Sequence, residues 1–383
     1  MVLMKIALLT IHSALNYGAL LQATAVYDTL YSLENDTTLL NFRYPPFCSI
    51  VDKTRRQELK NCKNFLRFCV KGCSIYKKKK NFDLFISKHI HKITSEFNTE
   101  SQLEQYCEEN KFDLFVCGSD QIWNPYNIRF EKAFFLSFTN EGAKKISYAA
   151  SIGQDSVQED GLEFIKENLV DFDSISVRED SAIRILQEAG ITQEVFVHVD
   201  PVFLLSQNSW RERENIVSLP EFCEKYVLVY RLTDNPQFDK ALEELKRSSG
   251  LPFVAITDRL GKIPFIDKKY MSLGPAEFLY LIDNAEYVVT DSFHGTAFSL
   301  IFEKKLIAVS NLKKNTRITT ILEKTGMIDC LVSQNSSTDI IPKLDYSDMY
   351  TKCRSRIMEL SREARQYLEK QVHNQNMAGR KDV

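Results

Sequence analysis

Short apolar runs alternate with longer helix-like segments along almost the whole chain, and this alternation limits the fold more than any other feature. The apolar run KIALLTIH, residues 5–12, is followed by a polar turn and a helix-like segment from 17 to 34. Strands separated by helices pair in parallel, with the helices covering the sheet. We therefore expect an α/β fold of doubly wound parallel sheets, whose ligands bind beyond the carboxyl ends of the strands.

The pattern occurs twice, which predicts two α/β domains. In the first half we expect strands near 5–12, 37–44, 112–119, 144–151, 174–178 and 195–199, and helices near 17–34, 100–109, 159–172 and 179–189. In the second half we expect strands near 226–232, 252–257, 286–290 and 305–310, and helices near 237–248, 276–284, 295–302 and 315–325. The predicted organisation is an acceptor-side domain 1–205, a donor-side domain 206–345, a helix 346–374 that packs back on the first domain, and a loose tail 375–383.

Length and composition agree with a globular enzyme. A chain of 383 residues exceeds what one core usually serves, and a hydrophobic content of 44% argues against disorder. No apolar run is long enough to span a bilayer, and no secretory signal is visible. Nine cysteines, an odd number, favour reduced thiols over a disulfide framework or a zinc site. We expect a cytoplasmic protein with no metal ion.

The run TDSFHGT, residues 290–296, places a histidine and a glycine where an apolar strand turns into a helix. The first turn of a helix offers backbone N–H groups and the positive end of its dipole, so an anion can bind there. Ser292, His294 and Gly295 are therefore candidate residues of an anion site with an acid attached. The alternative is a helix cap formed by Asp291 or Ser292, with a histidine that only packs.

Several further motifs follow predicted strands in the same order as in one known family. They are NYGALLQ at 16–22, CGSDQIWN at 117–124, YAASIG at 148–153, SVRE at 176–179 and VDPV at 199–202. Together with the histidine motif, this set resembles the polysaccharide pyruvyl transferase family over residues 5 to 330. The resemblance implies two domains facing a cleft, as in the GT-B glycosyltransferases, with a long C-terminal helix.

The resemblance also implies the reaction. The family moves the pyruvyl unit of phosphoenolpyruvate onto two hydroxyls of one hexose, which leaves a cyclic ketal and free phosphate, without a cofactor. The acceptor would be a cell-surface polysaccharide, such as a capsule or exopolysaccharide, or its lipid-linked precursor. Phosphoenolpyruvate carries a carboxylate and a phosphate, so its site should contain cations and a helix N-terminus. Its methylene carbon must receive a proton from a positioned acid.

For the donor, His294 is the predicted acid, because an imidazole can be charged near neutral pH. The family commonly has an arginine in or beside this motif, where the present chain has Phe293. The cation must then come from elsewhere. We predict Arg231 first, at the end of a strand, and Arg317 second, at the start of a helix.

For the acceptor, the turns after two strands of the first domain supply polar and aromatic side chains. Asp120 is a candidate base for the attacking hydroxyl, with a structural turn-capping role as an equal alternative. The predicted acceptor-binding residues are His12, Asn16, Tyr17, Gly18, Ser119, Gln121 and Trp123. Of these, His12 has a structural hydrogen-bonding role as its simpler interpretation.

The net charge of −2 is unevenly spread. Residues 53–80 contain eleven basic side chains and one acidic one, with aromatic residues between them, and end in Lys77 to Lys80. Such a segment can lie on an anionic membrane surface, which would make the protein peripheral at the inner face. The alternative is a solvated helical excursion of the first domain. Nucleic-acid binding is not expected, because the rest of the chain is acidic and no reader motif appears.

Two other functions stay open from the sequence. A glycosyltransferase with a nucleotide-sugar donor would have the same architecture, although the absence of a D-x-D pair near a donor loop weighs against metal-dependent transfer. A non-catalytic protein that keeps the fold is the third possibility.

Overall fold

The structure is a computed structural model of the chain, and it describes most of its length. The described ranges are 3–33, 35–43, 62–140, 142–214, 225–259, 263–310, 316–333 and 344–378. Two compact units are present. The first consists of Met1–Ile50, Ser87–Leu204 and Glu359–Val383, and the second of Val51–Ile86 and Leu205–Met358.

A parallel sheet forms the centre of the first unit. Its strands are β1 (Lys5–Leu9), β2 (Asp36–Leu39), β3 (Leu114–Cys117) and β4 (Lys144–Ser147), in the order β2-β1-β3-β4. A parallel pair, β5 (Ile175–Val177) and β6 (Val195–Val197), continues the sheet, because single bridges join Ile146 to Ser174 and Ala150 to Val177. β1 and β3 are buried over almost all their residues, as expected for central strands covered on both faces.

Helices follow these strands in the first unit. They are α1 (Tyr17–Ser32), α4 (Glu100–Asn110), α5 (Pro125–Ile128), α6 (Glu159–Leu169) and α7 (Asp180–Glu188), with the 3₁₀ turns η1 (Lys132–Phe135) and η2 (Pro201–Leu204). Asn16 caps α1, because its side chain accepts a hydrogen bond from the Ala19 amide. α1 is apolar on nearly all sides and buried over most of its length, which makes it a core helix rather than a surface one.

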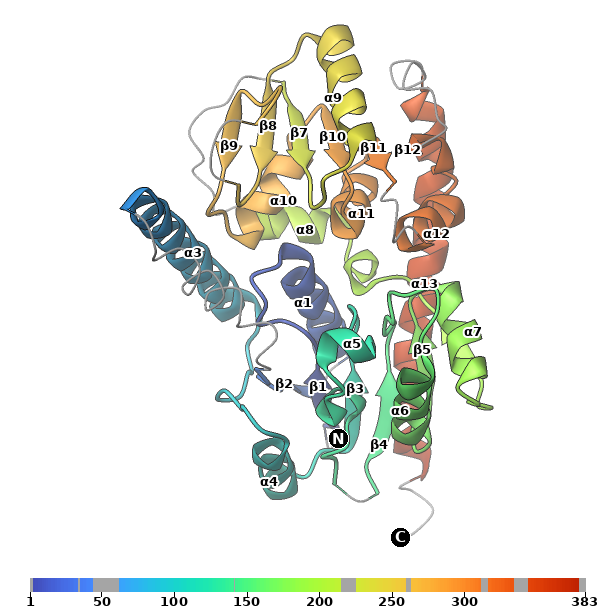
Figure 1. Ribbon diagram of the computed structural model, residues 1–383. Helices are drawn as coiled ribbons and strands as arrows, with labels where there is room; N and C mark the ends of the chain where they lie inside the picture. The colour runs from blue at the N-terminus through green and yellow to red at the C-terminus, as the bar shows by residue number, and fades with distance from the viewer. Residues whose placement is uncertain are drawn as a thin grey trace. The chain divides into compact units, whose positions relative to one another are not determined.

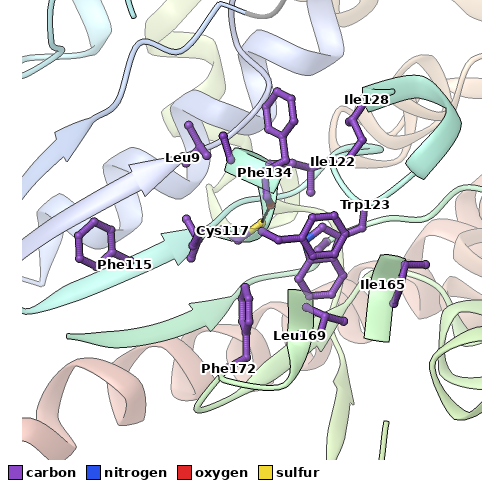
Figure 2. Close-up of a cluster of buried hydrophobic side chains, with 14 of the residues drawn as sticks. Leu9, Phe115, Cys117, Ile122, Trp123, Ile128, Phe134, Ile165, Leu169 and Phe172 are labelled. Carbon is purple, nitrogen blue, oxygen red and sulfur yellow. Dashed lines mark hydrogen bonds between the residues drawn. The ribbon is translucent and has the colours of Figure 1, made fainter. Parts of the chain in front are cut away.

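The core of this unit gathers large side chains between β3 and the helices after it. Figure 2 shows Trp123 at the centre of this cluster, beside Cys117, Phe134 and Phe172. The Trp123 ring stacks on Phe135, with centroids 5.6 Å apart and an interplanar angle of 9°. The segment after β3 therefore folds back into the core instead of running over the surface.

A six-stranded parallel sheet forms the second unit, and its strands lie side by side in Figure 1. The order is β12-β11-β10-β7-β8-β9. The strands are β7 (Val227–Tyr230), β8 (Phe253–Ile256), β9 (Lys268–Tyr270), β10 (Tyr287–Thr290), β11 (Lys305–Val309) and β12 (Leu331–Val332). The edge strands β9 and β12 were not predicted, because one has the sequence KKY and the other has two residues, so neither forms an apolar run.

Four helices of the second unit begin and end close to the predicted positions: α9 (Pro236–Ser249), α10 (Pro275–Asp283), α11 (Phe293–Ile301) and α12 (Thr316–Thr325). The helix α8 (Gln207–Glu214) and the 3₁₀ turn η3 (Ile328–Cys330) were not predicted. α9 begins after Asn235, whose side chain accepts from the Gln237 amide, and ends at Gly250 with a left-handed φ of 64°. The asparagine thus favours the start of the helix and the glycine favours its end.

The basic segment forms part of a long helix, α3 (Cys62–His89), that packs on the second unit. The Ser74 hydroxyl donates to the Met271 carbonyl at 3.1 Å, and the Asn81 amide donates to the Ser272 carbonyl at 3.0 Å. The sequence predicted an excursion of the first domain, so this expectation is corrected. Residues 53–61 of the segment lie outside the described part, as do the side chains of 62–71.

The C-terminal helix α13 (Tyr346–Ala378) contributes to both units. Near its start, the Tyr346 hydroxyl donates to the Leu306 carbonyl at 2.9 Å, within the second unit. Nearer its end, the Tyr367 hydroxyl donates to the Ser147 carbonyl at 2.9 Å, within the first unit. A helix over 346–374 that packs back on the first domain was expected, and the part from Glu359 onward belongs to the first unit. The helix runs on through 375–378, where a loose tail was expected, and residues 379–383 lie outside the described part. No helix in the described ranges combines the length and apolarity needed to cross a bilayer.

Candidate active site

The strand order reverses between β7 and β10 in the second unit. From β7 the chain adds β8 and β9 on one side, and then β10, β11 and β12 on the other. Ligands of open parallel sheets bind outside the carboxyl ends of the strands at such a reversal. The loop after β7, which begins at Arg231, and the loop after β10, which carries the histidine motif, meet at this place.

Asp291 joins these two loops. Its carboxylate accepts hydrogen bonds from the Leu232 amide at 2.7 Å, the Thr233 amide at 2.9 Å and the Thr233 hydroxyl at 2.5 Å. The helix cap is instead Ser292, whose hydroxyl accepts from the Gly295 amide at 3.3 Å. Asp291 therefore fixes the loop after β7 against the start of α11, and sequence reasoning had not found this role or that of Thr233.

Only glycine fits at position 295, because the backbone there passes close to the Thr290 side chain. A Cβ atom at this position would lie 2.5 Å from the Thr290 hydroxyl oxygen. That hydroxyl donates to the Tyr230 carbonyl at 2.7 Å and accepts from the Ser292 amide at 3.0 Å, so it cannot move without losing both bonds. The first turn of α11 therefore sits tightly against the ends of β7 and β10.

His294 lies in the first turn of α11, at the carboxyl edge of the sheet. Its side chain is largely buried and its ring packs edge-on against Phe293, with centroids 5.2 Å apart. Arg317, at the start of α12, places its guanidinium 6.0 Å from the centre of the Phe293 ring. A histidine, a helix N-terminus and an arginine are thus gathered around one motif.

Arg231 makes contacts with its own loop and with the first turn of α9. Its guanidinium donates to the Thr233 carbonyl at 2.7 Å, the Asp239 carboxylate at 2.6 Å and the Asn235 carbonyl at 3.1 Å, and it lies over the Phe238 ring. These bonds shape the loop that presents the two amides to Asp291. The donor-binding role predicted for Arg231 would require some of them to break.

The first sheet has its own reversal, between β1 and β3. Thr10 follows β1 and Ser119 follows β3. The Thr10 hydroxyl donates to the Ser119 carbonyl at 3.2 Å and accepts from the Gln22 side-chain amide at 2.9 Å. A Cβ atom on Gly118 would lie 2.6 Å from the Thr10 Cβ atom. Each unit thus uses a threonine and a glycine to bring two loops into contact at its reversal point.

Asp120 lies beside this contact in a left-handed backbone conformation, with φ of 68°. Its carbonyl accepts from the Ile122 amide at 2.7 Å and the Ser151 amide at 3.0 Å, and its carboxylate accepts from the Gln121 amide at 2.8 Å. The last bond is the turn-capping role that the sequence left open. A left-handed non-glycine residue costs about 1 kcal/mol or more, and such strain is concentrated at functional sites.

The other acceptor candidates differ in how accessible they are. Asn16 is exposed, whereas Tyr17 and Gly18 are buried in the first turn of α1. The Ser119 hydroxyl is buried and donates to the Ala149 carbonyl at 2.7 Å, and the half-buried Gln121 accepts from Asn127 at 2.5 Å. Among these five residues, only Asn16 is exposed.

His12 is buried, and its two ring nitrogens lie 3.0 Å from the Thr10 carbonyl oxygen and 3.0 Å from the Asn41 side-chain oxygen. Burial lowers the pKa of this imidazole. These contacts match the structural interpretation of His12.

The predicted contact of Trp123 with a sugar is corrected. Trp123 is fully buried and stacked in the hydrophobic core, so its ring cannot meet a ligand (Figure 2). The sequence pattern did not reveal this, because an aromatic residue in a loop after a strand fits a binding site and an inward turn equally well.

A buried ionic cluster lies at the same edge of the first sheet. The Arg178 guanidinium donates to the Asp200 carboxylate at 2.5 Å and lies 3.7 Å from the Glu179 carboxylate. The other Glu179 oxygen accepts from the Ser151 hydroxyl and from the Ile152 and Gly153 amides. These contacts hold the ends of β4, β5 and β6 together within the first unit.

Comparison with known proteins now identifies the family. The family model described as polysaccharide pyruvyl transferase matches residues 16–313. The chain belongs to this family. The matched range contains the reversal point of the second sheet and, in the first unit, the chain from Asn16 onward, whereas β1 lies before it. A comparison with curated proteins gave no significant match.

Solved structures with a similar fold include a UDP-GlcNAc 2-epimerase and a protein bound to UDP and glucose. The UDP-GlcNAc 2-epimerase of Neisseria meningitidis, bound to UDP-GlcNAc, has a TM-score of 0.55 and 12% identity, covering 92% of this chain and 94% of that one. Anabaena HepE, in complex with UDP and glucose, has a TM-score of 0.54 and 10% identity, covering 98% and 100%. At these identities the likeness shows the GT-B-like fold, which confirms the predicted fold class.

Proposed function

We propose that this polysaccharide pyruvyl transferase uses phosphoenolpyruvate as its donor and forms a cyclic ketal on two hydroxyls of a hexose. The acceptor would belong to a surface polysaccharide or its lipid-linked precursor. The observation that carries the proposal is His294 in the first turn of α11, at the reversal point of the second sheet. An acid beside an anion-binding helix end is what a phosphorylated enol donor requires.

We place the donor at the carboxyl edge of the second sheet. The first turn of α11 attracts a phosphate or carboxylate through its amides and dipole. Arg317 supports this, because its guanidinium lies against Phe293, the residue beside His294. Arg231 is the weaker candidate, since its hydrogen bonds already go to Thr233, Asn235 and Asp239.

The proposed reaction proceeds in two additions. His294, in its charged form, gives a proton to the methylene carbon of phosphoenolpyruvate, which makes a methyl group and a cationic carbon. One sugar hydroxyl attacks that carbon and loses its proton. The bond from this carbon to the phosphate oxygen then breaks, phosphate leaves, and the second hydroxyl adds and loses its proton. One released proton restores His294 and the other leaves with phosphate, so the transfer balances without an oxidant or a metal.

We place the acceptor at the carboxyl edge of the first sheet, near Asp120 and Asn16. Asp120 is held in a strained conformation at the reversal point, and a carboxylate there can accept the proton of an attacking hydroxyl. Asn16 is exposed at the start of α1 and offers an amide to a sugar hydroxyl. Trp123 takes no part in this site.

The test is incubation of the purified protein with phosphoenolpyruvate and a panel of galactosides, mannosides and N-acetylhexosaminides. Release of phosphate together with a ketal-bearing sugar in the mass spectrum would support the proposal. Solved structures of the same fold contain UDP-GlcNAc or UDP with glucose, so UDP-sugars are tested in parallel. Release of a nucleoside diphosphate, with no reaction of phosphoenolpyruvate, would replace the proposal by glycosyl transfer.

A further inference from the structure

The helix α3 presents two unlike faces along its described side chains. On its inner face Phe82, Phe85 and Lys78 are buried, and the Lys78 ammonium lies 3.5 Å from the Asp258 carboxylate. Together with the bonds from Ser74 and Asn81, these contacts fix the rotation of the helix on the second unit. The sequence alone could not assign the four successive lysines to different faces.

The outer face carries two lysines and two apolar side chains. Lys77 and Lys80 are exposed, Tyr76 is 73% exposed and Leu84 is 49% exposed. At about 100° per residue, these four positions fall on one side of the helix, away from Lys78 and Phe82. We call Tyr76, Lys77, Lys80 and Leu84 the outer face of α3.

Among the described residues, neither Lys77 nor Lys80 forms an ion pair with an acidic side chain. Asp83 is the acidic residue within the described part of α3, and it pairs with Lys79 at 2.9 Å on the flank of the helix. The outer face therefore keeps both of its positive charges. The sequence around it is strongly basic, whereas the remainder of the chain is acidic, so an attraction to anions is local to this segment.

We propose that the outer face of α3 docks the protein on an anionic phospholipid surface. Basic side chains gain about 1 kcal/mol each near such a surface, and exposed aromatic and aliphatic side chains enter the interfacial layer beside them. Lys77 and Lys80 meet the headgroups, while Tyr76 and Leu84 lie at the boundary with the acyl chains. This inference does not depend on the proposed reaction, although an enzyme that acts on lipid-linked acceptors gains from it.

The test is co-sedimentation of the full chain with vesicles of phosphatidylcholine alone or of phosphatidylcholine with phosphatidylglycerol. The unmodified protein should prefer the anionic vesicles, and the preference should weaken as salt is raised. The double variant Lys77→Gln/Lys80→Gln should lower the partition coefficient on anionic vesicles by about tenfold or more. Turnover on a short soluble acceptor should stay unchanged, which separates this result from failure of the proposed function.

The chain supplies a matched control for the charge change. Lys79→Gln removes a lysine on the flank of the helix and Lys78→Gln removes a buried one, so each should reduce anionic binding less than Lys77→Gln or Lys80→Gln does, although the charge change is the same. Thermal melting of every variant checks the fold. Equal binding of the unmodified protein to both vesicle types would overturn the proposal. It would also be overturned if Lys79→Gln reduced anionic binding as much as Lys77→Gln or Lys80→Gln did. Tighter binding to single-stranded nucleic acid than to anionic vesicles would overturn it as well.

Discussion

The bond between the two loops of the second unit can be tested by the substitution Asp291→Asn. The carboxylate accepts three hydrogen bonds in a buried position, two of them from backbone amides. An asparagine side chain keeps one acceptor oxygen and turns an N–H group toward a donor. One of the two backbone amides therefore loses its charge-assisted hydrogen bond and is left buried without an acceptor. The other amide keeps a hydrogen bond, but to a neutral oxygen instead of a charged one.

A buried hydrogen bond to a charged group is worth about 1.5–3 kcal/mol, and an unsatisfied buried donor costs about 1–3 kcal/mol. Because the lost bond and the unsatisfied donor are partly the same free energy, the two values do not simply add. We expect Asp291→Asn to destabilise the second unit by about 2–4 kcal/mol. Urea unfolding followed by tryptophan fluorescence measures this, because Trp210 is buried in the same unit. Calorimetry should also show weaker binding of phosphoenolpyruvate, since the loop is no longer fixed against α11.

The control is Asp234→Asn, which removes a carboxylate from the same loop at an exposed position. Its side chain is 80% exposed and paired with Arg259, so the stability should change little. A loss below about 1 kcal/mol for Asp291→Asn, or a loss equal to that of the control, would refute the reasoning that Asp291 holds the two loops together.

Three further outcomes follow from the same contacts. His294→Ala should lower turnover by about 10²–10⁴-fold with little loss of fold stability, and His294→Gln should not restore it; comparable turnover in either variant would exclude the acid role. Arg317→Ala should weaken phosphoenolpyruvate binding in calorimetry, whereas Arg231→Ala should mainly lower the melting temperature; unchanged donor affinity in Arg317→Ala would show that another cation is used. Burial raises the pKa of the Glu214 carboxyl from 4.5 to about 8, so the folded state keeps a proton that the unfolded chain loses, and stability falls as pH rises through this range. Glu214→Gln should therefore stabilise the protein at pH 9 but hardly at pH 5, and equal melting shifts at both pH values would contradict this.

The sequence predicted the fold class and most elements, because the apolar runs were long and clearly separated. The central strands β1, β3, β7 and β10 were confirmed within a few residues at each end. The histidine motif was also predicted correctly as a strand that ends in a helix, and Ser292, one of the two residues offered as a cap, forms it. Local patterns decide these features, since burial on both faces of a parallel sheet leaves a continuous apolar run.

The failures share one physical cause. Trp123 follows a strand like a binding residue, yet its ring is buried against Phe135, and the basic segment follows the first domain in sequence, yet it packs on the second unit. In the first case the loop turns the side chain inward, and in the second case the helix packs on residues far along the chain. A side-chain direction and a docking partner are set by packing, which a local pattern does not contain.

The sequence by itself determined that the chain forms two parallel α/β sheets, that a histidine stands at a helix start, and that one segment is strongly basic. Periodicity and charge are local properties, and they survive any change in tertiary contacts. Only the tertiary structure decided that Asp291 bonds to the loop after β7, that Arg231 is held by its own loop and by α9, and that Lys78 is buried while Lys77 and Lys80 face outward. These depend on which atoms meet across the fold, because hydrogen bonds and burial act only over a few ångströms.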